Sequence, residues 1–349
     1  MKITIIGASG AVGLQTTQAF LYKIVPNISE LNLIVNSENG MIRVHSLVRD
    51  ALVNLRSIKI NVSKTCENLE KTDIIIFCAG QAVSQELSQI KQSNRDQLYE
   101  KNLEIVMKYV DEINRNCEDA LFILVTNPVA KIMSNLYGKL NAKLVGVGVT
   151  NDTLRFRNAL YQNFQHTNNI EESISKAFII GDHSSYDRLT YVESLLDENI
   201  LKELTKERNL FNKKFQRQRD INEIKKYQEQ ELKKVFSGKK SICDMFENLN
   251  QLPTFMSSYF THRSIHFTMK TSFSTSLAIL ELVHMFCNHS EKYMSAEVVC
   301  NNYSSSEKSI LGIPITFRNG IIEPMQIKYS THEKQLLKTC FFNCKINNA

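Results

Sequence analysis

The first thirteen residues combine a short β-branched run with a glycine-rich turn, and this combination constrains the fold more than any other feature. Residues 3–6 (Ile-Thr-Ile-Ile) predict a buried strand, and residues 7–13 (Gly-Ala-Ser-Gly-Ala-Val-Gly) follow it directly. A helix-compatible segment then continues to about residue 25 and is stopped by Pro26. This order of strand, glycine turn and helix is typical of a dinucleotide-binding unit, in which the helix N-terminus faces a pyrophosphate.

Apolar runs alternate with helical segments through the rest of the N-terminal half. The candidate strands are residues 31–35, 58–62, 74–78, 121–125 and 144–147, and a long helix is expected over residues 95–116. Such alternation predicts a parallel sheet with helices on both faces, in which ligands bind at the carboxyl ends of the strands. Gly80, residues 126–128 (Thr-Asn-Pro) and Gly148 fall at those ends.

The second half of the chain has a less regular pattern. It contains a strand candidate at residues 177–180, an apolar helix at 272–287 and a final helix at 332–342. Two further strand candidates flank Asn319-Gly320, a strong signal for a β-hairpin. We therefore predict an α/β protein, with a Rossmann-type parallel-sheet domain over residues 1–150 and an α+β substrate domain over residues 151–349.

The positive charge of the chain is concentrated in one segment. The formal net charge is +6, and residues 196–240 contain 13 Lys or Arg and 8 Asp or Glu, which gives this segment +5. The remainder is close to neutral, which argues against a nucleic-acid-binding face. We expect a long charged insertion at about residues 196–250 to be helical, either as a solvated hairpin or as an arm that binds a partner or bridges subunits.

Composition excludes several other classes of protein. No apolar run approaches the roughly 18 residues of a membrane span, and the N-terminus lacks the apolar core of a secretory signal. The eight cysteines are scattered without C-x-x-C pairs, which favours reduced thiols and a cytoplasmic location. His284, Cys287 and His289 are close in sequence, but they follow an apolar helical run, and we predict no metal site.

Asp152 and Arg155 are three residues apart, so a helix that starts near residue 151 would place both on one face. Alone, they could equally be a helix cap and a surface ion pair. His183, in the run Gly-Asp-His-Ser, could likewise be a surface residue. What lies before and after these residues in the chain decides between such interpretations.

Six motifs in order give the chain a resemblance to the lactate/malate dehydrogenase family, and the N-terminal half is most similar to archaeal-type malate dehydrogenases. The motifs are residues 7–13, residues 94–98 (Asn-Arg-Asp-Gln-Leu) followed by Asn102, residues 125–129 (Val-Thr-Asn-Pro-Val), residues 148–157, residues 181–184 and residues 311–314 (Leu-Gly-Ile-Pro). The resemblance implies reversible hydride transfer between a nicotinamide cofactor and a 2-hydroxy acid or its 2-oxo acid, in a homodimer or homotetramer.

The resemblance also implies a role for each matching residue. His183 would be the catalytic base, and Asp152 would orient it. Arg155 would bind the substrate carboxylate through two parallel N–H groups, and Arg95 would polarise the reacting carbonyl once its loop closes. Asn127 would contact the substrate and the nicotinamide. The implied cofactor-binding residues are Gly7, Gly10, Val12, Gly13, Asn36, Asn102 and Asn127.

One departure from the family leaves the cofactor open. The strand at residues 31–35 ends at Val35-Asn36, where NAD-binding sheets usually present an acidic residue to the adenosine ribose. Asn36 lacks the charge that repels a 2′-phosphate, and no arginine stands at the tip to attract one. NAD is expected, and NADP remains a candidate.

A second departure leaves the substrate open. The segment from Gly80 to Arg95 is longer than in the family and lacks the family's first arginine. Counting back from Arg95 places Gln89 nearest to the position of that first arginine, and Lys91 lies two residues after Gln89. Malate/oxaloacetate is therefore expected first, with lactate/pyruvate or a larger 2-oxo acid next. The alternative is a catalytically weakened, dehydrogenase-like binding or scaffold protein that uses the basic insertion.

Overall fold

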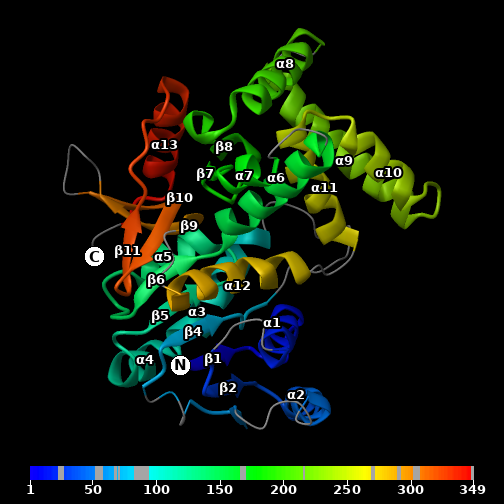
Figure 1. Cartoon of the computed structure of the whole chain (residues 1–349). Coiled ribbons are helices and arrows are strands. Elements are labelled where there is room, and N and C mark those ends of the chain that lie inside the picture. The colour runs from blue at the N-terminus through cyan, green and yellow to red at the C-terminus, as the bar shows by residue number, and fades with distance from the viewer. Residues whose placement is uncertain are drawn as a thin grey trace.

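The structure, a computed structural model, is built around one eleven-stranded sheet (Figure 1). It describes all of the chain except residues 23–26, 52–57, 67–68, 70, 82–93, 166–169, 215–216, 269–271, 289–291, 302–306 and 347–349. The side chains of residues 94–97, 212–225 and 262–268 are also not described. Among the described residues, no helix has the length and apolar character needed to cross a membrane.

The N-terminal half supplies six parallel strands in the order β3-β2-β1-β4-β5-β6. Their bounds are β1 (Lys2–Ile6), β2 (Glu30–Ile34), β3 (Lys59–Ser63), β4 (Ile74–Phe77), β5 (Leu121–Leu124) and β6 (Lys143–Gly146). All six were predicted. The order reverses between β1 and β4, and this switch point opens the crevice in which doubly wound sheets bind their ligands.

Helices cover both faces of these strands, because successive side chains of a strand point to opposite faces. The helices are α1 (Ala11–Leu21), α2 (Glu38–Ala51), α3 (Asn94–Met107), α4 (Val110–Asn116) and α5 (Val129–Leu136). On one face, Phe20 of α1 joins Ile5 in a buried cluster. On the other face, Ile132 of α5 joins Ile6 in a second cluster. The predicted two-sided cover is confirmed.

The C-terminal half extends the same sheet with antiparallel strands. They are β7 (Ile179–Gly181), β8 (Leu189–Tyr191), β9 (Met294–Asn301), β10 (Lys308–Arg318) and β11 (Ile321–Pro324). β6 pairs with β9 where Gly146 meets Glu297, so both halves share one sheet. β10 and β11 form the predicted hairpin, with positive φ angles of 50° at Asn319 and 72° at Gly320. The expected α/β class is confirmed, and the boundary at residue 150 remains a prediction.

Eight α-helices and two short 3₁₀ helices, Tyr186–Arg188 and Glu193–Leu195, complete the described part of this half. The α-helices are α6 (Gly148–Phe164), α7 (Ile170–Ser175), α8 (Glu198–Lys214), α9 (Arg217–Phe236), α10 (Ile242–Asn250), α11 (Thr254–Thr268), α12 (Phe273–Asn288) and α13 (Thr331–Asn343). α12 and α13 are the two helices expected near the C-terminus. Ser330 begins α13 with a capping box, in which its side chain and that of Glu333 each bind the other's backbone N–H.

The helical pattern predicted over residues 95–116 is confirmed, but it forms two helices, because a turn separates α3 from α4. At this turn the Tyr109 N–H bonds the Val106 carbonyl at 3.0 Å, three residues back instead of four. The Tyr109 ring also packs edge-on against Phe77 at 5.5 Å. No glycine or proline marks this turn, so the sequence carries no local signal for it.

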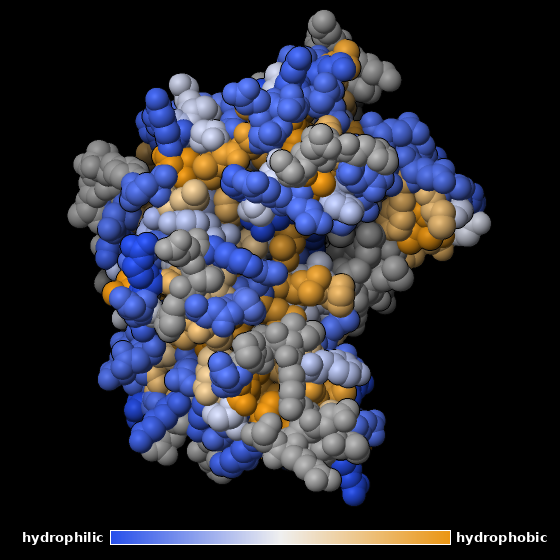
Figure 2. All heavy atoms as spheres, in the orientation of Figure 1, coloured by the Kyte–Doolittle hydropathy of each residue, from blue (hydrophilic) through white to orange (hydrophobic). Residues whose placement is uncertain are grey.

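The charged segment at residues 196–250 forms three helices, and the expected two-helix hairpin is wrong. Gly238 adopts a φ of 70° after α9, and the side chain of Ser241 caps the start of α10. α8 is also more than a solvated arm, since its Ile200 is buried in the same cluster as Phe156 of α6. Figure 2 shows mostly hydrophilic residues over this part, with a hydrophobic area near α10.

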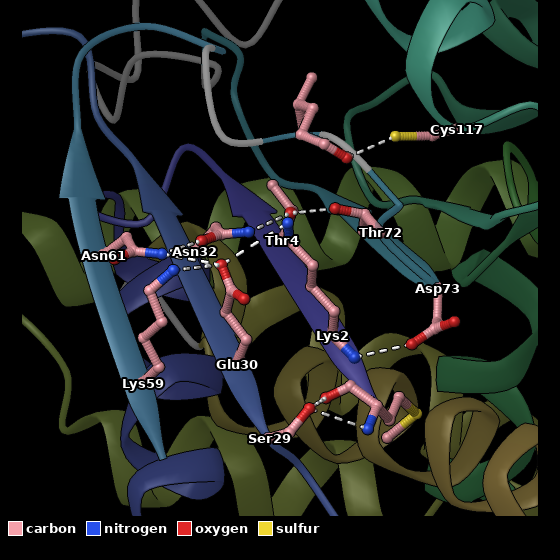
Figure 3. A network of polar contacts seen from close by, with 12 residues as sticks. Lys2, Thr4, Ser29, Glu30, Asn32, Lys59, Asn61, Thr72, Asp73 and Cys117 are labelled. Atoms are coloured by element: carbon pink, nitrogen blue, oxygen red, sulfur yellow. Dashed lines mark hydrogen bonds and ion pairs between the residues drawn. The ribbon is translucent and has the colours of Figure 1, made fainter.

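A line of polar side chains crosses β3, β2 and β1 within the sheet (Figure 3). Asn61 donates to Asn32 Oδ1 at 2.8 Å, and Asn32 donates to Thr4 Oγ1 at 3.3 Å. The hydroxyls of Thr4 and Thr72 lie 2.9 Å apart. Because Thr4 and Asn32 are buried, their polar groups need these partners, and the line stabilises the register of the three strands.

Replacing Asn32 with Ala should destabilise the protein by about 2 kcal/mol, because Thr4 and Asn61 each lose a partner inside the sheet. Urea unfolding followed by circular dichroism measures this free energy. Asn39→Ala, at an exposed position of α2, is the matched control and should change stability by less than about 0.5 kcal/mol. Equal losses in the two variants would contradict the proposed role of the polar line.

Candidate active site

The predicted glycine turn connects β1 to α1 at the switch point of the sheet. Gly7 has a φ of 90°, and a Cβ there would lie 2.5 Å from the backbone nitrogen of Ala79. A Cβ at Gly13 would lie 2.2 Å from the Gly7 carbonyl oxygen. Both positions therefore require glycine, because their backbones approach neighbouring backbone too closely for a side chain. The switch point brings this turn against the end of β4.

The exposed side of the turn fits a dinucleotide. A Cβ on Gly10 would meet only the Gly7 carbonyl, at 3.3 Å, so the space beside the start of α1 is open. The first N–H groups of a helix have no acceptor within the helix and carry positive dipole, which suits a pyrophosphate. Val12, in the first turn of α1, is partly buried. The residues present thus fit the cofactor that the motif implies.

The tip of β2 has the polar character expected from the sequence. Val35 is buried, whereas Asn36 is exposed. Arg43 of α2 places Nη1 3.4 Å from the carbonyl oxygen of Ser9, so a guanidinium borders the glycine turn from the β2 side. Arg43 was not predicted from the sequence, because it lies within α2 and not at the strand tip itself.

Asn127 and Asn102 lie at the carboxyl end of β5. Asn127 is exposed there, whereas Asn102 is fully buried. The amide of Asn102 donates to the carbonyls of Gln81 at 3.1 Å and Asn127 at 2.7 Å, and its oxygen accepts from Gln81 N–H at 2.6 Å. Both amide hydrogens of Asn102 are therefore used within the protein, so its side chain fixes the backbone of Asn127.

Asp152 lies in the second turn of α6, close to the end of β6, and its side chain is only 6% exposed. Its Oδ2 lies 2.7 Å from His183 Nδ1, and its Oδ1 lies 3.5 Å from Arg155 Nη1. The predicted spacing on one helical face is thus observed for Asp152 and Arg155. One buried carboxylate contacts both the candidate base and the candidate carboxylate-binding arginine.

The electrostatic environment favours a protonated imidazole. Burial acts to lower the pKa of His183, but the charge and hydrogen bond of Asp152, with a contribution from Glu297, raise it above its ordinary value. The Arg155 guanidinium opposes this rise. Because Nδ1 faces Asp152, Nε2 is the nitrogen available to a substrate.

The backbone that carries His183 is held by the residue before it. Asp182 accepts hydrogen bonds from the Ser184 N–H at 2.9 Å, from the Ser184 hydroxyl at 2.7 Å and from Arg188 Nη1 at 3.0 Å. Burial acts to raise the pKa of Asp182, but these bonds hold it below its ordinary value. Gly181, with a φ of 119°, allows the chain to turn here, since a Cβ would lie 1.9 Å from the Arg188 carbonyl oxygen.

Several predicted residues are not placed by the structure. Arg95 lies in the first turn of α3, but its side chain is outside the described residues. Gln89 and Lys91 lie outside them altogether, as does His289 of the possible metal cluster. Within the described residues, no group of three or more metal-ligating side chains is present.

Glu297 of β9 is a further acidic residue in the site, and it was not predicted from the sequence. It is 1% exposed, and its Oε1 accepts the N–H of Val149, the second residue of α6, at 2.8 Å. The sequence does contain a signal for Glu297. Residues 294–300 read Met-Ser-Ala-Glu-Val-Val-Cys, and a glutamate inside such an apolar strand is unusual.

Comparisons with known proteins bear on the fold and on the class of protein. Residues 1–144 match the NAD-binding domain of lactate/malate dehydrogenase. An L-lactate dehydrogenase from Macrococcus caseolyticus is 23% identical over 275 residues, which cover 78% of this chain and 73% of that protein. A malate dehydrogenase from Methanothermobacter thermautotrophicus is 28% identical over 192 residues, covering 53% of this chain and 55% of that protein.

The fold is shared with solved structures over nearly the whole chain. Malate dehydrogenase from Archaeoglobus fulgidus in complex with NADH has a TM-score of 0.70 and 18% identity, and the match covers 99% of this chain and 97% of that one. The fold and the matched N-terminal half define an α/β protein with a Rossmann-type NAD-binding domain, whose sheet continues into the second half of the chain. The resemblance to lactate and malate dehydrogenases that the motifs predicted is confirmed, since the N-terminal half matches the NAD-binding domain of these enzymes and the relatives found carry their names.

Replacing Asp182 with Asn should destabilise the protein by about 2 kcal/mol at pH 7, because the Arg188 guanidinium loses its buried partner charge. The folded-state pKa of Asp182 is lowered, so its stabilisation is present above the unfolded pKa and is lost as pH falls through the folded one. The difference from the parent protein should therefore shrink progressively as pH falls below roughly 4, the ordinary pKa of an aspartate. Urea unfolding at several pH values measures it.

Asp50→Asn, at an exposed position of α2, is the control and should show no such pH-dependent difference. A loss for Asp182→Asn that stays constant from pH 7 to below pH 3 would contradict the role of its charge.

Proposed function

We propose that the protein is an NAD(P)-dependent oxidoreductase that transfers hydride reversibly between a nicotinamide and a 2-hydroxy acid, acting on the CH–OH group. The observation that carries the proposal is the 2.7 Å contact between Asp152 and His183, with Arg155 beside it, at the carboxyl edge of a family dinucleotide-binding sheet. The relatives described above are named as dehydrogenases of such acids.

His183 serves as the acid–base group of the reaction. In the oxidation direction its Nε2 accepts the proton of the substrate hydroxyl, and in the reduction direction it returns that proton to the carbonyl oxygen. Asp152 keeps the Nδ1–H tautomer in place and stabilises the imidazolium that forms. When bound, the nicotinamide supplies the hydride acceptor or donor.

Arg155 binds the substrate carboxylate. Its Nε is buried without a hydrogen-bond partner among the described residues, and its contact with Asp152 is long for an ion pair at 3.5 Å. Burial lowers the pKa of Arg155, which reflects the cost of placing a guanidinium away from water. A carboxylate supplies the acceptors that this guanidinium lacks, in a bidentate geometry.

Asn127 and Arg95 complete the substrate side of the proposal. Asn127 is exposed at the carboxyl end of β5, so its amide is available to the nicotinamide end of the cofactor and to the substrate. Asn102 supports the same contact indirectly, by holding the Asn127 carbonyl. For Arg95, the role in polarising the carbonyl rests on the family motif.

We propose that Gly7, Gly10, Val12 and Gly13 contact the cofactor pyrophosphate and that Asn36 contacts the adenosine ribose. NAD is the expected cofactor, since the N-terminal half matches an NAD-binding domain. NADP is the second candidate, because Asn36 presents no carboxylate against a 2′-phosphate and Arg43 offers a cation nearby. Measuring kcat/KM with each reduced cofactor separates them.

For the substrate, malate/oxaloacetate is our first candidate, and lactate/pyruvate or a larger 2-oxo acid is the second. We also propose a homo-oligomer in the cytoplasm, as the family resemblance implies. The scaffold alternative is not favoured, because the relatives are named as dehydrogenases and the acid–base pair of such an enzyme is present. Absence of turnover across oxaloacetate, pyruvate and larger 2-oxo acids with both cofactors would overturn the proposed function.

Replacing His183 with Asn should lower kcat by a factor of about 10²–10⁴, because proton transfer loses its acid–base group. The affinity for the reduced cofactor, measured by nicotinamide fluorescence, should be unchanged. His45→Asn, at an exposed position of α2, is the matched control and should keep full activity. Full activity of the His183 variant would show that another group moves the proton.

Replacing Arg155 with Lys should lower kcat/KM for the 2-oxo acid by about 10–100-fold, mainly through KM, because lysine keeps the charge but loses the bidentate geometry. Steady-state kinetics with the preferred 2-oxo acid measures both constants. Arg49→Lys, at an exposed position of α2, should leave them unchanged. An unaltered KM in the Arg155 variant would argue that the carboxylate binds elsewhere.

A further inference from the structure

Glu297 is a carboxylic acid buried in the sheet beside the candidate active site, and nothing in the proposed reaction yet uses it. It stands on β9 between Gly146 of β6 and Gly312 of β10. Among the described residues, no lysine or arginine forms an ion pair with it. Since glutamate is almost never fully buried without a partner, its retention here requires a reason.

The two oxygens of Glu297 have different environments. Oε1 accepts the Val149 N–H at 2.8 Å, at the positive end of the α6 dipole. Oε2 is buried and has no hydrogen-bond partner among the described residues. Oε1 therefore holds the start of α6. The negative charge of Oε2 is not balanced by a hydrogen bond from the described residues, so it can stabilise a nearby cation.

His183 is the basic group that faces Glu297. A Cβ built on Gly148 would lie 2.3 Å from Glu297 Oε1 and 2.8 Å from both Cβ and Cγ of His183, so the carboxylate and the imidazole border the same small space. Gly148 is what lets them approach, because any side chain there would separate them.

The charged residues near Glu297 are those of the candidate site. The charges of His183 and Asp152 act on Glu297 directly, and Arg155 acts on the His183 imidazole. The residues paired with Glu297 on the neighbouring strands β6 and β10 are both glycine, so they add no charge. Burial raises the pKa of Glu297 to about 7, and the charge of His183 opposes that rise. Glu297 therefore gains its charge in the neutral range, where the proposed acid–base group also works.

We propose that Glu297 is a positioning residue for His183, and that its carboxylate joins Asp152 in stabilising the protonated imidazole needed to reduce a 2-oxo acid. This inference rests on the proposed function. Two carboxylates then share one imidazolium, so His183 stays protonated to higher pH than Asp152 alone would allow. Reduction at neutral and mildly alkaline pH is favoured as a result.

A purely structural role is the competing explanation. Glu297 ties α6 to β9 through Val149, and Thr150 makes a second tie by donating to the Ser295 carbonyl at 2.7 Å. Substitution by Gln separates the two explanations, because the amide oxygen still accepts the Val149 N–H while the charge is removed. A structural role predicts little change on this substitution, whereas the proposed role predicts an altered pH profile.

The experiment compares the parent protein with Glu297→Gln by the pH dependence of kcat/KM in both directions. The part of each pH profile that reports the His183 pKa should move to lower pH by about one unit. At pH values above this pKa, kcat/KM for reduction should fall about tenfold, and at pH values below it, kcat/KM for oxidation should rise. Glu333→Gln is the matched control: Glu333 is equally buried and also accepts backbone N–H bonds, but it lies on α13. Its pH profile should not move.

A second measurement does not depend on turnover. Histidine side-chain NMR, with the His183 signal assigned by its loss in His183→Asn, should show a lower His183 pKa in Glu297→Gln than in the parent. An unchanged His183 titration, or a shift to higher pH, would overturn the proposal. If no 2-oxo acid is turned over, the proposed function fails, while the NMR titration still decides the role of Glu297.

Discussion

The buried charge of Asp152 is the constraint on which the candidate site depends. A carboxylate that is only 6% exposed is tolerated when cationic or hydrogen-bonding groups surround it, and here His183 and Arg155 supply them. Both partners are held in this way, since Nδ1 of the imidazole faces Oδ2 and the guanidinium Nη1 faces Oδ1, while Arg155 Nε has no hydrogen-bond partner among the described residues. The proposed proton-transfer group and the proposed carboxylate-binding group are thus positioned by the same carboxylate.

The continuity of the sheet brings these groups together. β6 ends at Gly146 and α6 starts at Gly148, so Asp152 follows the parallel half, whereas His183 follows β7 of the antiparallel half. The pairing of β6 with β9 joins the two halves at Glu297. A rigid sheet therefore sets the distance between the acid–base pair and the cofactor turn, and small residues at the junction let the charged groups approach.

Features that depend on local pattern were predictable from the sequence. The six parallel strands are apolar runs bounded by turn residues, and Asn319-Gly320 specifies its hairpin by positive φ angles. Asp152 and His183 could be singled out because both stand in motifs of the family that the chain resembles, and their catalytic roles stay a prediction.

Features that depend on contacts between distant segments were not predictable. The turn at Tyr109 has no breaker residue and packs on Phe77 of another element. Asn102 binds the backbone of Gln81 and Asn127 in place of an exposed ligand position, and Glu297 meets His183 only after the sheet has formed. Long-range contacts also bear on the proposed chemistry. Arg155 lies on α6 and His183 follows β7, and both are held by the buried carboxylate of Asp152. The residues proposed to bind the hydroxyl and the carboxylate, which all 2-hydroxy acids share, are therefore fixed by one set of contacts. Discrimination among these acids requires contact with their other end, which neither His183 nor Arg155 makes in the proposed mechanism. In this proposal the choice of substrate can therefore change while the acid–base pair is kept.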